Sequence, residues 1–539
     1  MNKHIIVLIV GFIAISAYGK LPQADFRVVP LPNTIEKNEK GKSFILTKEC
    51  GIECGGDTLT ARLLAEDVEK ATGFRLEMVK KNVKKNRPSV KFEINNSVKH
   101  PEGYEIRVNN KNIIITASTR AGLFYGCKTL FKSLPQIKAD SVEVPAYVIS
   151  DAPRFSYRGM LLDCGRHFFP IKDVKTFIDM LALHNMNTLH WHLTEDQGWR
   201  FEVKKHPVLT KIGSKRRGSE IGWAVGLNDS IPHEGYYSQD DCREIIRYAA
   251  ERNITVIPEI DIPGHTTSLL ACFPELGCTG GPYTVSDHWG VHEDIVCAGN
   301  DKTFEILQDV FDEICDVFPS EYINIGGDEA PKTRWEKCPK CQARIEKEGI
   351  TASDSRTKES ALQGWFTRQI EQYLNKKGRK VIGWNEIAET GASATSAIMN
   401  RYDSVATANA VREGRDVVVN TSAYCYFDYP QSSDLRLEPK LFPLGETVGL
   451  SRVYSLEPVP DGLSEEEKSH ILGVQANVWG EFISKLLLVQ YQTLPRMAAM
   501  SEVQWTESGN KNYKDFLYRL PGMRKVYDTH GYFHKAHFE

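Results

Sequence analysis

The chain has 539 residues, which is too long for one ordinary domain. Its formal net charge of −3 at pH 7 gives no electrostatic basis for binding nucleic acid or an anionic membrane.

The N-terminus has the pattern of a secretory signal peptide. Lys3 and His4 precede an apolar run over residues 5–15, and the small residues Ala17 and Gly19 offer a cleavage site. The run is too short for a membrane span. We therefore expect removal of residues 1–19 and an exported protein, periplasmic or secreted, with no stable membrane anchor.

Twelve cysteines in an exported protein permit disulfides, but they are scattered along the chain. Cys338 and Cys341 form the one tight pair. Zinc needs two more ligands, and no second pair stands nearby in the sequence. A local disulfide or two free thiols is therefore favoured over zinc for this pair, and Cys272 and Cys278 could also bridge.

Residues 20–150 have the pattern of a small α+β domain. Helical spacing of apolar residues occurs around residues 59–68 and 123–134. Short strand patterns occur at residues 44–46, 74–79, 90–94, 104–108 and 113–116. This region contains no constellation of catalytic side chains.

From Asp151 onward, apolar strands alternate with longer helical stretches, which indicates repeated β-α units. Eight such units over roughly 350 residues predict a (β/α)8 barrel within residues 151–539. An open doubly wound sheet fits less well, because no glycine-rich phosphate loop follows any strand. The eight expected strands cover residues 159–163, 187–193, 254–260, 322–325, 380–384, 396–400, 416–420 and 472–478.

The fourth of these strands runs directly into Gly326-Gly327-Asp328-Glu329. Neighbouring side chains in a regular strand point to opposite faces, so both acids can share one site only where the chain leaves the strand. The two glycines permit that departure. The alternative is a strand followed by an acidic helix N-terminus.

Other strand ends also carry polar and aromatic side chains, and the C-terminal ends of barrel strands meet at one rim. Acids there can accept from hydroxyl groups, and indole rings can stack on a sugar ring. We therefore expect an uncharged, hydroxyl-rich ligand. The segments concerned are residues 163–167, 190–199, 259–265, 383–386, 424–429 and 477–481.

The motif Gly326-Gly327-Asp328-Glu329 resembles the signature of family 20 glycoside hydrolases, the β-N-acetylhexosaminidases. Six further motifs match the family in order, and the resemblance covers about residues 25 to 510: residues 166–168, 192–200, 263–265, 383–386, 426–428 and 477–481. It implies a (β/α)8 TIM barrel behind a non-catalytic α+β domain, with no cofactor and no metal. Asn324 departs from the family, where many members carry His, and we expect this to affect packing rather than chemistry.

The resemblance implies substrate-assisted catalysis, in which the substrate's own 2-acetamido oxygen is the nucleophile. Glu329 would be the general acid and later the base. Asp328 would orient the acetamido N–H and stabilise the oxazolinium intermediate, and Tyr426 would donate to the acetamido carbonyl oxygen. We expect burial or a like charge to raise the pKa of Glu329, while Asp328 stays ionised.

The remaining matched residues would bind the terminal sugar: Arg166, Asp196, His265, Trp365, Trp384, Asp428, Trp479 and Glu481. Asp196 and His265 resemble a relay pair beside Glu329. Arg166 could instead be a structural salt-bridge partner, and Trp365, on a predicted helix, could pack in the core.

Two further groups of residues also have a more ordinary interpretation. His190 and His192 could suggest a metal, but satisfied interior histidines are favoured. Structural or supporting roles are expected for four acids: Glu195, Glu259, Asp261 and Glu386.

The sequence thus predicts an exo-acting retaining β-N-acetylhexosaminidase that removes terminal β-linked GlcNAc or GalNAc from oligosaccharides or glycoconjugates. A lacto-N-biosidase or a 6-sulfo-GlcNAc-directed enzyme of the same family is the alternative. A non-catalytic sugar-binding protein is expected to have lost Asp328 or Glu329, and both are present. The choice between GlcNAc and GalNAc, and whether the chain forms a homodimer, stay open.

Overall fold

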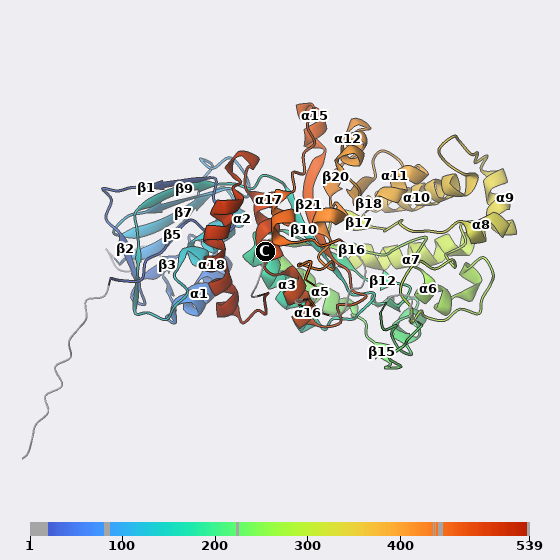
Figure 1. Cartoon of the computed structure of the whole chain (residues 1–539), viewed down its shortest axis with the longest axis horizontal. Helices are drawn as coiled ribbons and strands as arrows, with labels where there is room; N and C mark the ends of the chain where they lie inside the picture. Colours follow the sequence, from blue (N-terminus) through green and yellow to red (C-terminus); the bar gives the residue numbers. More distant parts are fainter. Residues whose placement is uncertain are drawn as a thin grey trace, which may run out of the picture.

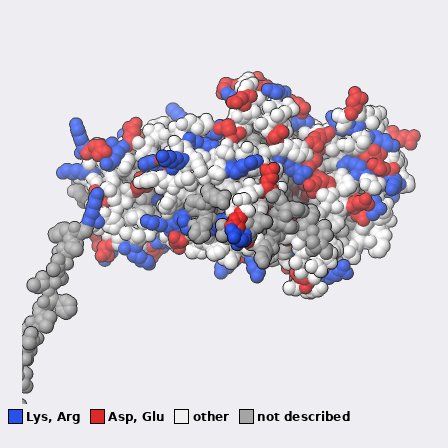
Figure 2. Space-filling view, in the orientation of Figure 1, with Lys and Arg blue, Asp and Glu red and all other residues white. Residues whose placement is uncertain are grey.

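The computed structural model describes residues 20–79, 87–222, 226–434, 436, 438–439 and 446–535. The expected signal segment, residues 1–19, lies outside these residues. The chain forms a smaller sheet-and-helix part and a larger barrel, side by side along the long axis (Figure 1). Within the described ranges, no helix is both long and apolar enough to cross a membrane. Blue and red side chains are mixed over the face drawn in Figure 2, as the nearly balanced net charge leads one to expect.

The N-terminal part is built on a seven-stranded sheet in the order β1-β9-β6-β7-β5-β3-β4. Helices α1 (Thr58–Thr72) and α2 (Arg120–Ser133) contact each other, and both carry the apolar residues that predicted them. The strands are β1 (Thr34–Lys37), β3 (Gly51–Glu53), β4 (Glu77–Val79), β5 (Ser89–Ile94), β6 (Tyr104–Val108), β7 (Asn112–Ala117) and β9 (Tyr147–Asp151), with β2 (Phe44–Thr47) and β8 (Ser141–Val144) as a separate pair. The sequence pattern did not show β1, β3, β8 and β9, and β1 is largely exposed and so carries little apolar signal.

The larger part is a closed barrel of eight parallel strands, which confirms the predicted fold class. Every expected strand matches an observed one to within two residues at each end. The strands are β10 (Tyr157–Asp163), β11 (Thr188–His192), β16 (Thr255–Glu259), β17 (Tyr322–Asn324), β18 (Lys380–Trp384), β19 (Ala397–Asn400), β20 (Val417–Val419) and β21 (Ile471–Val478).

Helices surround the barrel and occupy the loops at its C-terminal rim. The longer ones are α3 (Ile171–Leu183), α5 (Gln239–Ala250), α7 (Asp301–Val317), α10 (Lys358–Lys376), α12 (Ser404–Arg412), α16 (Leu486–Thr493) and α17 (Arg496–Trp505). Shorter ones are α4 (Val208–Lys211), α6 (Thr267–Cys272), α8 (Thr333–Lys337), α9 (Pro339–Lys347), α11 (Asn385–Thr390), α13 (Ser422–Cys425), α14 (Leu450–Ser455) and α15 (Glu465–Ser469). Short strands β12 (Thr194–Glu195), β13 (Gly198–Trp199), β14 (Lys215–Arg216) and β15 (His233–Glu234) also lie in these loops.

The barrel interior is filled by side chains, so a ligand must bind at the rim. Its apolar cluster combines large and small residues from all around the barrel: Tyr157, Leu161, Ile257, Ile382, Trp384, Ala397, Met399 and Val418.

The two parts share buried polar contacts. Arg158 of β10 donates to Glu102 at 2.7 and 2.9 Å, and the Trp505 indole donates to Asp151 at 2.9 Å. The last helix, α18 (Tyr513–His530), returns to contact α1 and α2 (Figure 1).

Candidate active site

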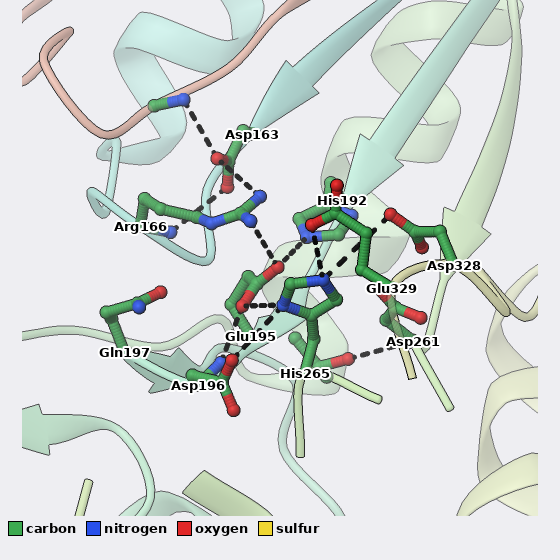
Figure 3. A network of polar contacts seen from close by, with 12 residues as sticks. Asp163, Arg166, His192, Glu195, Asp196, Gln197, Asp261, His265, Asp328 and Glu329 are labelled. Atoms are coloured by element: carbon green, nitrogen blue, oxygen red, sulfur yellow. Dashed lines mark hydrogen bonds and ion pairs between the residues drawn. The ribbon is translucent and has the colours of Figure 1, made fainter. Parts of the chain in front are cut away.

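The chain leaves β17 through a turn with left-handed backbone angles. Gly326, Gly327 and Glu329 have φ values of 63°, 97° and 47°. A Cβ atom on Gly326 would lie 1.8 Å from Asp261 Oδ1, so this position requires glycine. The buried Asn324 side chain accepts from the Gly326 N–H at 2.8 Å, which is a packing role for this departure from the family. The turn brings Asp328 and Glu329 to the same rim, where both face the Nε2 side of His265 (Figure 3).

His265 lies between two pairs of acids. Its Nδ1 is 3.1 Å from Asp196 Oδ2 and 3.2 Å from Glu195 Oε2. Its Nε2 is 3.5 Å from Glu329 Oε2 and 3.9 Å from Asp328 Oδ2. Asp196 is held in turn by the Thr267 N–H at 2.8 Å. The arrangement can pass charge or a proton between Asp196 and Glu329 through the imidazole.

The pKa values of Asp328 and Glu329 are shifted in the directions opposite to those expected from the sequence. Burial lowers the pKa of His265, but Glu195, Asp196 and Glu329 outweigh it and raise that pKa well above the ordinary value. The close contact with the His265 imidazole, together with the charge of Arg401, lowers the pKa of Glu329 to about 2. Burial raises the pKa of Asp328. The expectation of a raised pKa for Glu329 is therefore wrong.

The two acids also differ in exposure. The side chain of Glu329 is 37% exposed, whereas that of Asp328 is 9% exposed. Glu329 thus lies closer to solvent, where a leaving group would depart, and Asp328 lies deeper.

Arg166 bridges the ends of neighbouring strands. Its guanidinium is 2.7 Å from Glu195 Oε1 and 3.3 Å from Asp163 Oδ2. It also lies 5.2 Å from the centre of the Trp479 ring. Arg166 therefore makes the structural salt bridges of the alternative interpretation while remaining at the rim.

Aromatic rings from three strand ends meet beside these charges. Trp384 and Trp479 have ring centres 5.5 Å apart, and Tyr426 lies 6.1 Å from Trp479. Trp384 is almost fully buried, and its indole donates to Glu259 at 3.0 Å. Trp384 is thus part of the floor of the site, and the less buried Trp479 lies over it.

Several buried polar atoms at the rim lack a hydrogen-bond partner among the described residues. They include Asp328 Oδ1, the Tyr426 hydroxyl and Asp428 Oδ1. Burial, and next the charge of Glu481, raises the pKa of Asp428 well above its ordinary value. A buried polar atom without a partner costs about 1–3 kcal/mol. A ligand rich in hydroxyl and amide groups would satisfy these atoms.

Trp365 lies away from the other expected site residues, and the prediction that it binds the sugar is wrong. It lies on α10 in the outer helix layer, 5.5 Å from Phe304 of α7. The Arg344 guanidinium lies 5.0 Å from its ring centre. The structure thus favours the packing alternative, because α10 presents this indole to α7 rather than to the rim.

Arg401 was missed. It directly follows β19, the one barrel strand whose end was not considered from the sequence, and its Nη1 is 3.3 Å from Glu329 Oε1. Its other terminal nitrogen pairs with Glu386. The rule that strand ends supply site residues was the signal that could have identified it. Glu195, expected to be a supporting residue, joins Arg166 to His265.

A parallel barrel with paired acids, a buried arginine and aromatic rings at its C-terminal rim defines a TIM-barrel protein with a carboxylate-rich site. Two descriptions of known families match the chain. "Glycosyl hydrolase family 20, catalytic domain" matches residues 155–508, and "Glycosyl hydrolase family 20, domain 2" matches residues 25–152. The chain belongs to glycosyl hydrolase family 20.

Its relatives include a β-hexosaminidase of Porphyromonas gingivalis, 35% identical over 524 residues. That match covers 95% of this chain but 65% of the relative, so this chain spans slightly less than two thirds of it. Among solved structures, an exo β-N-acetylglucosaminidase of Vibrio harveyi in complex with N-acetylglucosamine aligns with a TM-score of 0.81 at 30% identity, over 95% of this chain and 79% of that one. A β-N-acetylhexosaminidase of Bacteroides fragilis aligns with a TM-score of 0.77 at 30% identity, over 94% and 96%.

Proposed function

We propose that this protein is an exo-acting, retaining β-N-acetylhexosaminidase that releases terminal β-linked GlcNAc or GalNAc from glycans. The observation that carries the proposal is the adjacent pair Asp328 and Glu329, which both face His265 Nε2 at one rim but differ in depth and environment. The names of the relatives support the same activity.

The reaction we propose uses the substrate's acetamido group as nucleophile. Asp328 would accept the acetamido N–H through Oδ1, and the Tyr426 hydroxyl would donate to the acetamido oxygen; neither atom has a hydrogen-bond partner among the described residues. That oxygen would attack the anomeric carbon while Glu329 protonates the departing oxygen. Glu329 would then deprotonate a water that opens the oxazolinium ion, with net retention. Alignment of the acetamide is worth several kcal/mol, up to about 7–11 in the best cases.

Glu329 must gain a proton before it can act as an acid. Arg401 does not give up its proton, so the nearest proton donor is the His265 imidazolium, whose Nε2 is 3.5 Å from Glu329 Oε2. A bound sugar would displace water from the exposed Glu329 side chain and so disfavour its charge. We therefore expect substrate binding to shift the shared proton from His265 to Glu329.

The remaining rim residues would hold the sugar. Arg166 would contact the 3- and 4-hydroxyls, and Asp428 and Glu481 would accept from the 4- and 6-hydroxyls. Trp479 would stack under the ring, with Trp384 as its support.

The first test compares hydrolysis of aryl β-GlcNAc with that of aryl β-glucoside by the purified protein. Cleavage of the first alone is expected, because only it carries the acetamido nucleophile. Equal cleavage of both would mean a nucleophile on the enzyme and would overturn the roles of Asp328 and Tyr426. Release of a disaccharide from an aryl lacto-N-bioside, with neither monosaccharide cleaved, would instead support the lacto-N-biosidase alternative.

Aryl β-GlcNAc substrates with poor and with activated leaving groups test Asp328 directly. Asp328→Asn should impair hydrolysis of every aryl β-GlcNAc, whatever its leaving group, because acetamide alignment precedes departure. Asp309→Asn, on the outer helix α7, is a matched control that should leave hydrolysis unchanged.

We also propose that the protein is exported after cleavage near Gly19, on the evidence of its N-terminal sequence pattern. N-terminal sequencing of the mature protein should begin close to Lys20. A mature chain that retains residues 1–19 would contradict this proposal.

A further inference from the structure

Four cysteines from two loops converge beside the barrel rim. Cys278 follows the short 3-10 helix Pro274–Leu276, and Cys297 lies just before α7. Cys338 follows α8, and Cys341 lies in the first turn of α9. All four sulfurs lie within 4.8 Å of one another, and three of the residues are buried. The group could not be recognised from sequence spacing, because Cys297 precedes Cys338 by 41 residues and Cys278 precedes Cys341 by 63 residues.

The spacing of the sulfurs matches a tetrahedral metal site. Cys278 and Cys341 are 3.8 Å apart, and Cys297 is 3.6 Å from Cys338 and 3.5 Å from Cys341. Four sulfurs at about 2.3 Å from a zinc ion would be about 3.8 Å from each other. Cys297 contacts two sulfurs at nearly equal distance, so no pairing into two disulfides stands out.

The backbone around these cysteines is built to hold them together. Gly277 pairs with Val296 in an antiparallel bridge, and the Cys297 N–H donates to the Leu276 carbonyl at 2.7 Å. These contacts bring Cys278 and Cys297 side by side from opposite ends of one long loop.

The second pair is packed against the first through backbone and a tryptophan. A Cβ on Gly299 would lie 2.2 Å from the Lys340 carbonyl, so the loop before α7 lies directly on the backbone of α9. The Trp335 indole donates to the Val296 carbonyl at 3.0 Å. The four ligand positions are therefore fixed by the fold.

We propose that Cys278, Cys297, Cys338 and Cys341 bind one structural zinc ion. Four protein sulfurs complete the coordination of zinc, which leaves no open position for a substrate and makes the site structural rather than catalytic. Four thiolates in a tetrahedron are the ligand set that selects zinc or iron, and zinc is inert to the oxidants outside a cell. In this arrangement Cys338 and Cys341 form neither the local disulfide nor the two free thiols that the sequence favoured. Cys272 also does not bridge Cys278, because its thiol donates to the Ser268 and Val208 carbonyls.

The position of the site gives the ion a role. The loop with Cys278 and Cys297 follows β16 and also carries His265, and the segment with Cys338 and Cys341 follows β17 and the Asp328–Glu329 turn. Zinc would fasten these two segments to each other. It would thereby keep His265 within reach of Glu329.

Metal analysis of the full-length protein tests the proposal. The protein is purified without chelator or metal-affinity resin, and zinc and iron are measured by mass spectrometry. We expect one zinc per chain, and Cys278→Ser and Cys341→Ser should each lower the zinc content several-fold. Cys242→Ser, a buried cysteine on α5, should retain all of the zinc.

A second measurement keeps the test decisive if a cysteine variant fails to fold. Zinc in the unaltered protein is exchanged for cobalt, and the visible spectrum is recorded. Absorption bands of tetrahedral cobalt thiolate are expected, together with thiols that resist alkylation until the metal is removed. Disulfide-linked Cys278–Cys341 or Cys297–Cys338 peptides, stoichiometric iron, or four alkylatable thiols with no bound metal would each overturn the proposal.

Discussion

Two groups of buried polar side chains, one inside the barrel and one at its C-terminal rim, differ in how completely they are hydrogen-bonded. In the interior group, His190, Glu259, Asn324 and Gln475 are fully buried and bonded to one another or to neighbours. His190 is 2.9 Å from Glu259 and 3.0 Å from Gln475, and Asn324 lies 3.1 Å from His190. His192 also pairs with Glu259. His190 is thus a satisfied interior histidine.

At the rim, Asp328, Tyr426 and Asp428 are also buried, yet each has a polar atom without a partner among the described residues. Burial alone therefore does not distinguish a structural polar group from a functional one. The difference lies in whether hydrogen bonding is complete. A buried polar group without a partner destabilises the protein, and a ligand that forms the missing hydrogen bond removes that cost.

The largest effect expected at the rim is that of Glu329→Gln. Loss of the acid should reduce kcat/KM about 10²- to 10⁴-fold on substrates with poor leaving groups. The reduction should be much smaller on activated aryl leaving groups, which depart without a proton. Steady-state kinetics on both substrate classes measure this difference, and an equal loss on both would show that Glu329 is not the general acid.

A substitution in the interior group should lower the free energy of unfolding. Glu259→Leu removes the carboxylate that His190 and His192 share, and breaking such a buried pair should lower the free energy of unfolding by about 3–5 kcal/mol. Urea denaturation followed by fluorescence measures this loss. Glu251→Leu is the control, because this acid at the end of α5 is half-exposed and its ion pair with Arg62 lies at the surface, so the free energy of unfolding should change little. If both variants unfold alike, the interior group is not a structural unit.

Tyr426→Phe should have the opposite effect to Glu259→Leu: it should reduce activity at the rim without reducing stability. The hydroxyl lacks a hydrogen-bond partner among the residues that the structure describes, so its removal should leave the free energy of unfolding unchanged or raise it slightly. Hydrolysis should nevertheless fall about 10²- to 10³-fold, because the acetamido oxygen loses its donor as charge develops. A variant that is clearly less stable and fully active would place Tyr426 with the interior group.

The smallest expected effect is a shift in pH dependence. The pKa of His265 is raised, so the proton shared with Glu329 is kept until the pH rises through that raised value. In His265→Asn only Glu329 can hold the proton, and its ordinary pKa is about 4.3. The basic limb of kcat/KM, which reports the free enzyme, should therefore move to lower pH.

A distant histidine provides the control for this shift. His470 is 2.9 Å from Asp416, just before β21 at the far end of the barrel, and His470→Asn should leave the pH profile unchanged. Identical profiles for the unaltered protein and His265→Asn would contradict the shared proton.

The sequence by itself determined the barrel and most of its rim. Strand periodicity identified all eight strands, because a buried parallel strand is a short, nearly continuous apolar run. Parallel strands end at one rim, so Asp328, His265 and Trp479 could be grouped without coordinates. The glycine pair before Asp328 predicted the change of direction, since left-handed angles favour glycine.

Only the tertiary structure decided features that depend on which side chains face each other. Trp365 lies in the outer layer because of the direction in which α10 presents it, and helix position alone does not set that direction. The low pKa of Glu329 depends on Arg401 and His265, which approach it from other strands. The four cysteines meet because two loops are folded onto each other, and closeness in space between residues 278 and 341 leaves no periodic signal in the sequence.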